Sequence, residues 1–259
     1  MNTKLKTQDV AVIGICSALY AVFGILTGGL TFFGIGFLPA VVIPAVFAAL
    51  FGPWVGGLSG AIGIFIRDMV VHGNPALSLA AGVPPNFILF FMIGYLYSRN
   101  ISLKQALAGV TIAAVGLLVP SIVFLPDMAA YAGFTSEAFL LTFVLTIIAS
   151  LVIITLISVR YTEWRSYAIG AVVGQIAGGL LLSVIIWIVS PLFLTTLGLS
   201  EPLGAALILP IFIWTIATEI PFILLAGPPI IKTVQKAFPA LQYRNRPQGK
   251  GGTIAKENR

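Results

Sequence analysis

The amino-acid sequence predicts an all-α fold, a polytopic membrane helical bundle of about eight transmembrane helices, and three observations favour it. Only 8% of the residues are charged and 59% are hydrophobic, whereas water-soluble domains carry about 25% charged residues. The mean hydropathy is +1.07. Apolar runs of about 20 residues, long enough for a hydrocarbon core roughly 30 Å thick, follow one another along the chain. The 259 residues are therefore expected to form one membrane domain.

Short polar or Pro/Gly-rich connections separate eight apolar segments. The segments cover residues 10–33, 36–52, 53–72, 82–98, 105–125, 138–159, 166–190 and 204–231. The second and third are divided only by Gly52-Pro53, which predicts a hairpin of short or tilted helices. Internal prolines such as Pro221 predict kinks, which membrane helices tolerate when neighbouring groups satisfy the freed backbone.

The basic residues predict the orientation of the bundle. Of the 14 Lys and Arg residues, all except Arg67 fall on one side once the N-terminus is placed inside. These inner residues are Lys4, Lys6, Arg99, Lys104, Arg160, Arg165, Lys232, Lys236, Arg244, Arg246, Lys250, Lys256 and Arg259. The outer connections carry Asp127, Glu137 and Glu201. Cytoplasmic loops are enriched in Lys and Arg, so we expect a multi-pass protein of the cell membrane with both termini cytoplasmic.

The same pattern suggests three regions. Residues 1–9 are expected to be a cytoplasmic N-terminus, and residues 10–232 a transmembrane helical domain. The first apolar run is long for a signal peptide and more runs follow, so it is interpreted as a retained helix. Residues 233–259 are expected to form a basic cytoplasmic tail without stable structure, because they are polar and rich in glycine.

The composition excludes several kinds of chemistry. Cys16 and His72 are the single cysteine and the single histidine, so an intrachain disulfide and a multi-histidine metal site are excluded. No Walker A, His-Glu-x-x-His or Gly-x-Ser-x-Gly motif occurs in the sequence. We therefore expect no enzymatic activity and no cofactor or metal. The basic residues are explained by membrane topology rather than by binding to nucleic acid.

Small residues mark the third segment. Gly56, Gly60 and Gly63 recur at helical spacing, and small residues four apart let membrane helices approach closely. Two interpretations stand: plain helix packing, or tight packing beside a ligand cavity.

The densest polar cluster follows these glycines at the predicted outer end. Asp68 and His72 are four residues apart and share a helix face; Arg67, Asn74 and Asn86 are near them in the sequence. One interpretation is a substrate site open to the outside, with hydrogen bonds from the polar side chains and a charge from Arg67. The other is an interfacial anchor, in which Arg67 reaches the headgroups and Asp68 compensates its charge.

Two further polar residues lie inside apolar segments. Glu219 is near the middle of the last segment, where an unpaired acidic group costs several kcal/mol. Arg67 is a candidate ion-pair partner; the alternative is a protonated carboxyl, because burial disfavours its charged form. Gln175 lies among Gly174, Gly178 and Gly179. A glutamine there bridges helices or contacts a ligand.

Several stretches resemble the substrate-binding S components of energy-coupling factor (ECF) transporters, a type of ABC transporter. The first helix, Ala-Val-Ile-Gly-Ile-Cys-Ser-Ala-Leu-Tyr-Ala over residues 11–21, has the small-residue character of that family. The stretch Phe-Gly-Pro-Trp-Val-Gly-Gly-Leu-Ser-Gly over 51–60, closing on Arg67-Asp68, resembles its glycine hairpin and acidic helix end. Gly227-Pro228-Pro229 is also similar.

This resemblance implies a vitamin-capturing membrane subunit that works with a transmembrane coupling subunit and ATPase subunits. It implies that the outer polar residues Arg67, Asp68, His72, Asn74 and Asn86 fall where the family builds its ligand site. Small residues on the first helix would contact the coupling subunit, here Gly14, Ser17, Ala18 and Ala21. S components usually have six helices, so residues 105–159 would be an extra helical pair.

The function predicted from these observations is capture of a vitamin or similar micronutrient at the outer face for an ECF-type importer. Candidate substrate-binding residues are Arg67, Asp68, His72, Asn74, Asn86, Glu219 and Gln175. The alternative is a stand-alone, proton-coupled secondary transporter of a small polar solute, with Glu219 carrying the proton. A membrane enzyme and a purely structural protein fit less well, because the former needs a nucleophile with its base and the latter needs no charges in the membrane.

Overall fold

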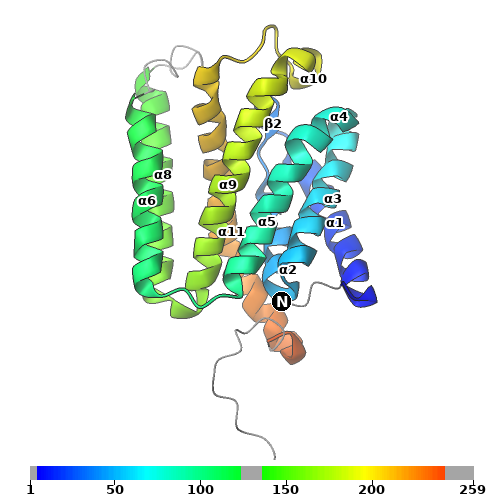
Figure 1. The fold of residues 1–259 in the computed structure, drawn as a ribbon, viewed down its shortest axis with the longest axis vertical. Helices are drawn as coiled ribbons and strands as arrows, with labels where there is room; N and C mark the ends of the chain where they lie inside the picture. Colours follow the sequence, from blue (N-terminus) through cyan, green and yellow to red (C-terminus); the bar gives the residue numbers. More distant parts are fainter. Residues whose placement is uncertain (1–4, 124–135, 243–259) are drawn as a thin grey trace, which may run out of the picture.

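The chain forms a bundle of long helices, as the apolar runs predict (Figure 1). The computed structural model describes residues 5–123 and 136–242. In this part of the chain, 5 helical stretches are long and apolar enough to cross a membrane. They are Thr7–Thr27, Pro53–Val71, Pro75–Tyr97, Thr162–Leu192 and Ala205–Ala237. Each of the eight apolar segments contains a helix, and the number that cross the bilayer stays a prediction.

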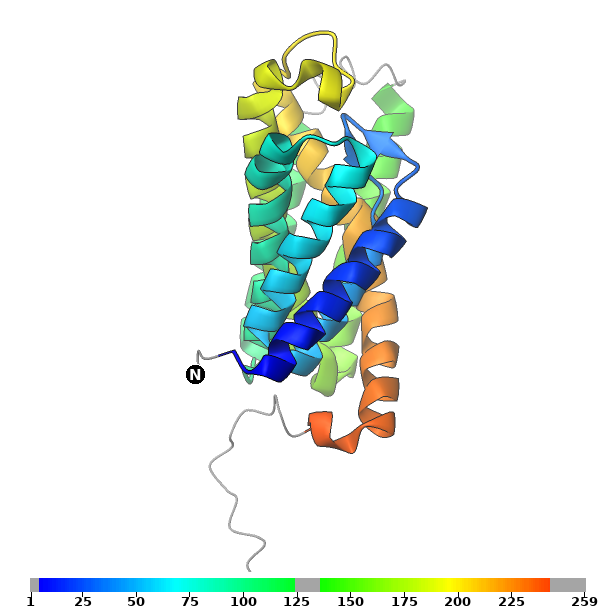
Figure 2. The same ribbon diagram turned by 90° about the vertical axis from the view of Figure 1, so that its right-hand side faces the viewer.

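Six helices of the described chain form the main part of the bundle. They are α1 (Thr7–Thr27), α2 (Val42–Phe51), α3 (Pro53–Val71), α5 (Val83–Tyr97), α9 (Arg165–Val189) and α11 (Ile208–Ala237). Helix α1 packs on α3, α3 on α5, α5 on α9 and α9 on α11, while α2 contacts α3, α5 and α11. The two views show this arrangement (Figures 1 and 2).

Helix α2 is a short buried helix rather than a full-length span. It has 10 residues, about 15 Å at 1.5 Å per residue, or half of a hydrocarbon core. Ala45, Ala48 and Ala49 are fully buried, which explains its uniformly apolar sequence. The predicted break is real: Gly52 has a φ of 100°, which favours glycine, and Pro53 then begins α3.

A β-hairpin connects α1 to α2. Strand β1 (Thr31–Phe32) pairs antiparallel with β2 (Ile35–Gly36). Phe33 and Gly34, between them, both have positive φ, 48° and 78°, as two-residue type I′ turns require. A 3₁₀ turn, Pro39–Val41, then leads into α2.

The remaining elements are short, except for one helical pair. Helix α4 (Pro75–Leu77) and a π-helical turn (Ser78–Gly82) precede α5, and α10 (Leu194–Leu197) follows α9. Single 3₁₀ turns cover Thr162–Trp164, Ser190–Leu192, Ala205–Leu207 and Pro239–Gln242. Helices α6 (Leu103–Val123) and α8 (Ser136–Arg160) pack on each other and against α9, and α8 also contacts α11. They occupy the position of the predicted extra pair.

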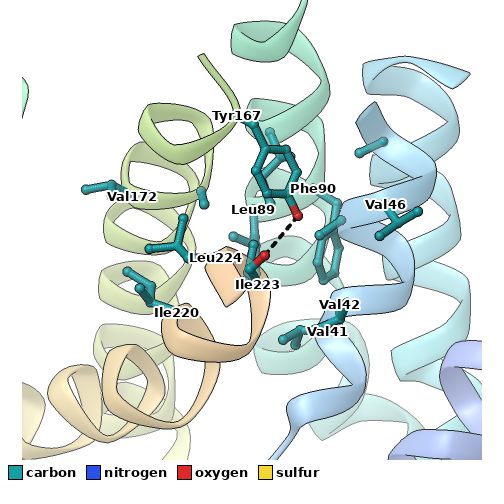
Figure 3. Close-up of a cluster of buried hydrophobic side chains, with 14 of the residues drawn as sticks. Val41, Val42, Val46, Leu89, Phe90, Tyr167, Val172, Ile220, Ile223 and Leu224 are labelled. Carbon is teal, nitrogen blue, oxygen red and sulfur yellow. Dashed lines mark hydrogen bonds between the residues drawn. The ribbon is translucent and has the colours of Figure 1, made fainter. Parts of the chain in front are cut away.

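Apolar side chains from α2, α5, α9 and α11 form the core (Figure 3). Labelled members are Val41, Val42, Val46, Leu89, Phe90, Tyr167, Val172, Ile220, Ile223 and Leu224. The Tyr167 hydroxyl donates to the Ile223 carbonyl over 3.3 Å, so the one polar atom of this buried ring is satisfied. A Cβ on Gly227 would collide with the same hydroxyl.

The glycines of α3 serve packing. A Cβ on Gly56 would collide with Ala48 of α2, one on Gly60 with the Phe90 ring, and one on Gly63 with Tyr20 of α1. Because these three glycines face other helices, the structure supports the helix-packing interpretation.

Gly94 lies where α5 closely approaches the start of α3. A Cβ there would lie 2.7 Å from the Cα of Pro53, a backbone atom that cannot rotate away. We expect Gly94→Ala to destabilise the protein by about 1–3 kcal/mol, as overpacking does. The matched control is Gly109→Ala on α6, where the nearest atom would be 3.9 Å away and alanine's helix propensity favours the change. Unfolding midpoints in detergent measure both; equal midpoints would contradict the expectation.

Both described chain ends lie at the same end of the bundle (Figures 1 and 2). We call it the basic end, because it carries Lys6, Arg99, Lys104, Arg160, Arg165, Lys232 and Lys236 at helix termini. Glu201 lies in a connection at the opposite end, which we call the hairpin end. That the basic end is cytoplasmic stays a prediction. Helix α11 continues to Ala237, beyond the expected boundary at residue 232, and residues 1–4, 124–135 and 243–259, with Asp127 among them, lie outside the described part.

Candidate functional site

The predicted polar cluster comes together at the hairpin end. The last turns of α3 supply Arg67 and Asp68, His72 caps that helix, and α5 supplies Asn86. These side chains line one cavity of about 90 Å³ together with Glu219 from α11. Helices that are distant in sequence therefore build one polar cavity. Its other lining residues are Gly34, Ile35, Gly36, Leu38, Ile64, Leu77, Ala81, Gly82, Leu182, Ile186, Thr196 and Leu197.

Arg67 is buried inside the protein. It is 7% exposed, and its Nη1 lies 3.1 Å from Oδ1 of Asp68. A Cβ on Gly28 or Gly36 would lie 2.7 or 2.6 Å from its Nη2, so glycines leave the room that the guanidinium occupies. Its Nε is buried without a hydrogen-bond partner. The interfacial-anchor interpretation is therefore wrong for the side-chain position, although Asp68 does compensate the charge.

Asp68 is the centre of the hydrogen-bond network. Its Oδ2 accepts a hydrogen bond from the Ser78 hydroxyl at 2.7 Å and lies 3.8 Å from Nε2 of His72, as the four-residue spacing predicts. Nδ1 of His72 accepts from the backbone N–H of Asn74, which leaves the proton of a neutral imidazole on Nε2, facing Asp68. The carboxylate thus holds α3 against the turn that leads to α5.

Asn74 and Asn86 both connect elements. The Asn74 side chain accepts from the backbone N–H of Leu77 and donates to the hydroxyl of Thr196, so it caps α4 and contacts α10. It does not line the cavity. Asn86 accepts from the Tyr20 hydroxyl at 2.8 Å and donates to the Gly82 carbonyl at 2.9 Å. Both polar atoms of Asn86 are thereby used within the protein.

Glu219 does not pair with Arg67. Among residues 5–123 and 136–242, the ion pair found in this cluster is that of Asp68 with Arg67, and His72 also lies near Asp68. Glu219 is 9% exposed and makes a side-chain hydrogen bond with Gln175 of α9. The predicted Arg67–Glu219 pair is wrong because Asp68, the next residue, is already at ion-pair distance.

Gln175 lines an inner recess of about 20 Å³. Asn86, Leu182 and Glu219 border both the recess and the polar cavity. The recess lies deeper in the bundle, as its other lining residues show: Pro85, Leu89, Gly178, Gly179 and Thr215. The prediction that Gln175 bridges helices and the prediction that it faces a ligand space are therefore compatible.

Sequence reasoning missed the hairpin and α10 as walls of the cavity. Gly34, Gly36 and Leu197 border the cavity mainly with small or apolar groups, which carry no chemical signal. Trp214 of α11 donates from its indole N–H to the Ile35 carbonyl at 3.1 Å, which holds β2 over the cavity. A two-residue turn with glycine was the detectable sign of a hairpin.

The small residues of α1 divide between two faces. Ser17 and Ala21 are buried, and the Ser17 hydroxyl donates to the Ser59 carbonyl of α3. Gly14 and Ala18 are exposed, and a Cβ on Gly14 would meet nothing within 4 Å. Of the four predicted docking residues, Gly14 and Ala18 are thus the two that lie on the outer surface.

The described residues were also considered for a metal site and compared with known proteins. Within residues 5–123 and 136–242 there is no group of three or more His, Cys, Asp or Glu side chains that could hold a metal ion. No solved structure matches the chain. The family model described as "ECF transporter, substrate-specific component" matches residues 8–139, a segment that includes α1, the hairpin, α2, α3, α5 and α6. The protein is a membrane protein that belongs to the family of substrate-specific components of ECF transporters.

Proposed function

We propose that this protein captures a vitamin or similar micronutrient at the outer face of the cell membrane for an ECF-type importer. One observation carries the proposal. A polar cavity, built from buried charged side chains on α3 and α11 and from Asn86 on α5, opens at the end of the bundle opposite the basic end. Placing charged groups inside a membrane bundle is costly, and such residues mark substrate pathways.

Membership of this family supports the assignment of substrate binding and ATP hydrolysis to separate subunits. Substrate-specific components belong to transporters, and the sequence contains no Walker A motif. ATP hydrolysis would then be the task of separate ATPase subunits, reached through a transmembrane coupling subunit. Gly14 and Ala18 on the exposed face of α1 would contact that coupling subunit, since small residues permit close helix approach in membranes.

The cavity in this structure is smaller than a typical small-molecule pocket. Its volume of about 90 Å³ compares with the ~300–1,000 Å³ of typical small-molecule pockets. Binding of a vitamin would require the hairpin and α10 to move outward. Neither element is a long helix, so such a movement leaves the packing of the main bundle intact.

The test is native mass spectrometry of the purified full chain, before and after incubation with a mixture of vitamins. We expect one small molecule per chain, and we expect Ala108→Trp on the exposed face of α6 to bind it as the wild type does. A chain that is empty on purification and stays empty after incubation would contradict the proposal.

Proton-coupled secondary transport is the second candidate, because Glu219 is a buried carboxyl with no basic partner among the described residues. The two candidates differ in what the chain does alone. In proteoliposomes that contain only this chain, a pH gradient would drive solute uptake by a secondary transporter. A capture subunit would bind substrate but accumulate none without its partner subunits.

A further inference from the structure

Glu219 brings a negative charge to the cavity when its carboxyl is ionised. Arg67 and Asp68 form an ion pair with Nη1 and Oδ1 3.1 Å apart, so their charges largely cancel inside the site. Glu219 of α11 is a second carboxyl in the lining of the cavity, and no Lys, Arg or His of the described chain lies within ion-pair distance of it. An ionised Glu219 therefore gives the lining one negative charge that the protein leaves uncompensated.

Hydrogen-bond acceptors surround that charge in the inner recess. The Gln175 side chain is 1% exposed, and its Oε1 has no hydrogen-bond partner. The Thr215 hydroxyl donates its hydrogen bond to the Phe212 carbonyl at 2.7 Å. Toward the recess it therefore acts as an acceptor. An unpartnered buried acceptor is costly. Glu219, Gln175 and Thr215 therefore form a set of acceptors that a donor from outside the chain would satisfy.

The size of the recess limits what enters it. At about 20 Å³ it accommodates roughly one water-sized group. A single nitrogen with its hydrogens fits this space, whereas a ring or a carboxylate does not. The carboxylate would also be repelled by Glu219. The wider polar cavity, bordered by Arg67 and the hairpin, would hold the rest of the molecule.

We infer that the site selects a small organic cation whose protonated amine or amidine nitrogen enters the recess and donates hydrogen bonds to Glu219 and Gln175. This inference rests on the proposed capture function and narrows its substrate class. Glu219 supplies the opposite charge, and Gln175 supplies a neutral acceptor in a fixed position. Anionic vitamins, and neutral ones without such a nitrogen, are the molecules that this arrangement disfavours.

The test uses six named compounds with the purified full chain. Pyridoxamine carries a protonated amine. Thiamine carries its charge on a thiazolium nitrogen without a hydrogen, and its amidine-like aminopyrimidine supplies the N–H donors. Riboflavin and pyridoxine carry no permanent charge, and pantothenate and biotin are anions. Binding is measured by titration calorimetry and by the shift in unfolding temperature that a ligand bound to the folded state produces. We expect binding by cationic members of the set.

Glu219→Gln then removes the charge while keeping the size of the side chain. We expect it to weaken binding of the cation by about 10- to 100-fold, as loss of a hydrogen bond to a charged group does. Gln175→Leu should weaken it by about 5-fold or more, the scale of one neutral hydrogen bond. The matched control is Glu201→Gln, the same change at an exposed residue, which should leave affinity unchanged. Unfolding temperatures of the unliganded variants verify that each is folded.

The outcomes separate the two proposals. Binding of a neutral or anionic compound, or a cation affinity that Glu219→Gln leaves intact, would overturn the inference on substrate class while leaving the capture function standing. Failure of the wild type to bind any of the six compounds, combined with an empty chain in native mass spectrometry, would overturn both.

Discussion

Replacing Gly14 or Ala18 with tryptophan should abolish substrate uptake while leaving substrate binding intact. Both residues are exposed on α1, and the space beside Gly14 is open for 4 Å around a Cβ, so the fold should tolerate the change. A bulky ring on this face would keep the coupling subunit from approaching closely, because close approach of membrane helices depends on small residues. The expected loss is the whole of the uptake signal.

Two measurements are needed for this prediction. The first is co-purification of the coupling and ATPase subunits with the tagged chain from cells that express all of them. The second is the affinity of the purified chain for the compound that it binds. Ala108→Trp is the matched control, since Ala108 is also exposed but lies on α6, on another side of the bundle (Figure 1). Normal assembly and uptake by both α1 variants would show that docking occurs elsewhere.

Replacing Asp68 with asparagine should be among the most destabilising single changes in the protein. Arg67 would then be a buried cation that has lost its ion-pair partner, and breaking a buried pair from one side costs about 3–5 kcal/mol. The double variant Arg67→Met, Asp68→Asn should recover most of that loss, because it leaves no unpaired charge. The measurement is the free energy of unfolding of each variant in detergent.

Ligand affinity distinguishes the structural role of this pair from a role in binding. Both the single and the double variant should bind substrate more weakly than the wild type, since Arg67 and Asp68 border the cavity. Glu163→Gln, at an exposed position near the basic end, is the control for charge removal. A double variant that is stable and binds normally would show that Arg67 and Asp68 do not contribute to substrate binding.

Much of the fold follows directly from hydropathy. Long apolar runs leave few alternatives to helices, because a bilayer cannot satisfy unpaired backbone groups. The helix break at Gly52 was readable because Gly-Pro favours the end of one helix and the start of the next. The sequence left open whether α2 is short or tilted, because an apolar run does not distinguish a lipid-facing span from a short helix buried on all sides.

The candidate site was predictable in its members and not in its contacts. Buried charges such as Arg67 and Glu219 stand out in an apolar sequence, and both line the cavity. Their partners depend on tertiary geometry: Asp68 rather than Glu219 pairs with Arg67. The faces of α1 were likewise not readable, since Ser17 and Ala18 are adjacent in sequence but one is buried and the other exposed.

The short length of α2 has a kinetic consequence. Helix α2 is only about half as long as a membrane span. The hairpin and the residues that follow it precede α2, and Gly36 and Leu38 of this segment line the cavity. Under the proposed capture function, entry and exit of substrate would depend on how often this segment opens, and we expect both rates to fall below the diffusion limit. The indole of Trp214 donates to the Ile35 carbonyl and its ring lies 5.4 Å from the Phe32 ring. In a variant whose other three tryptophans are replaced by phenylalanine, its emission would report each opening.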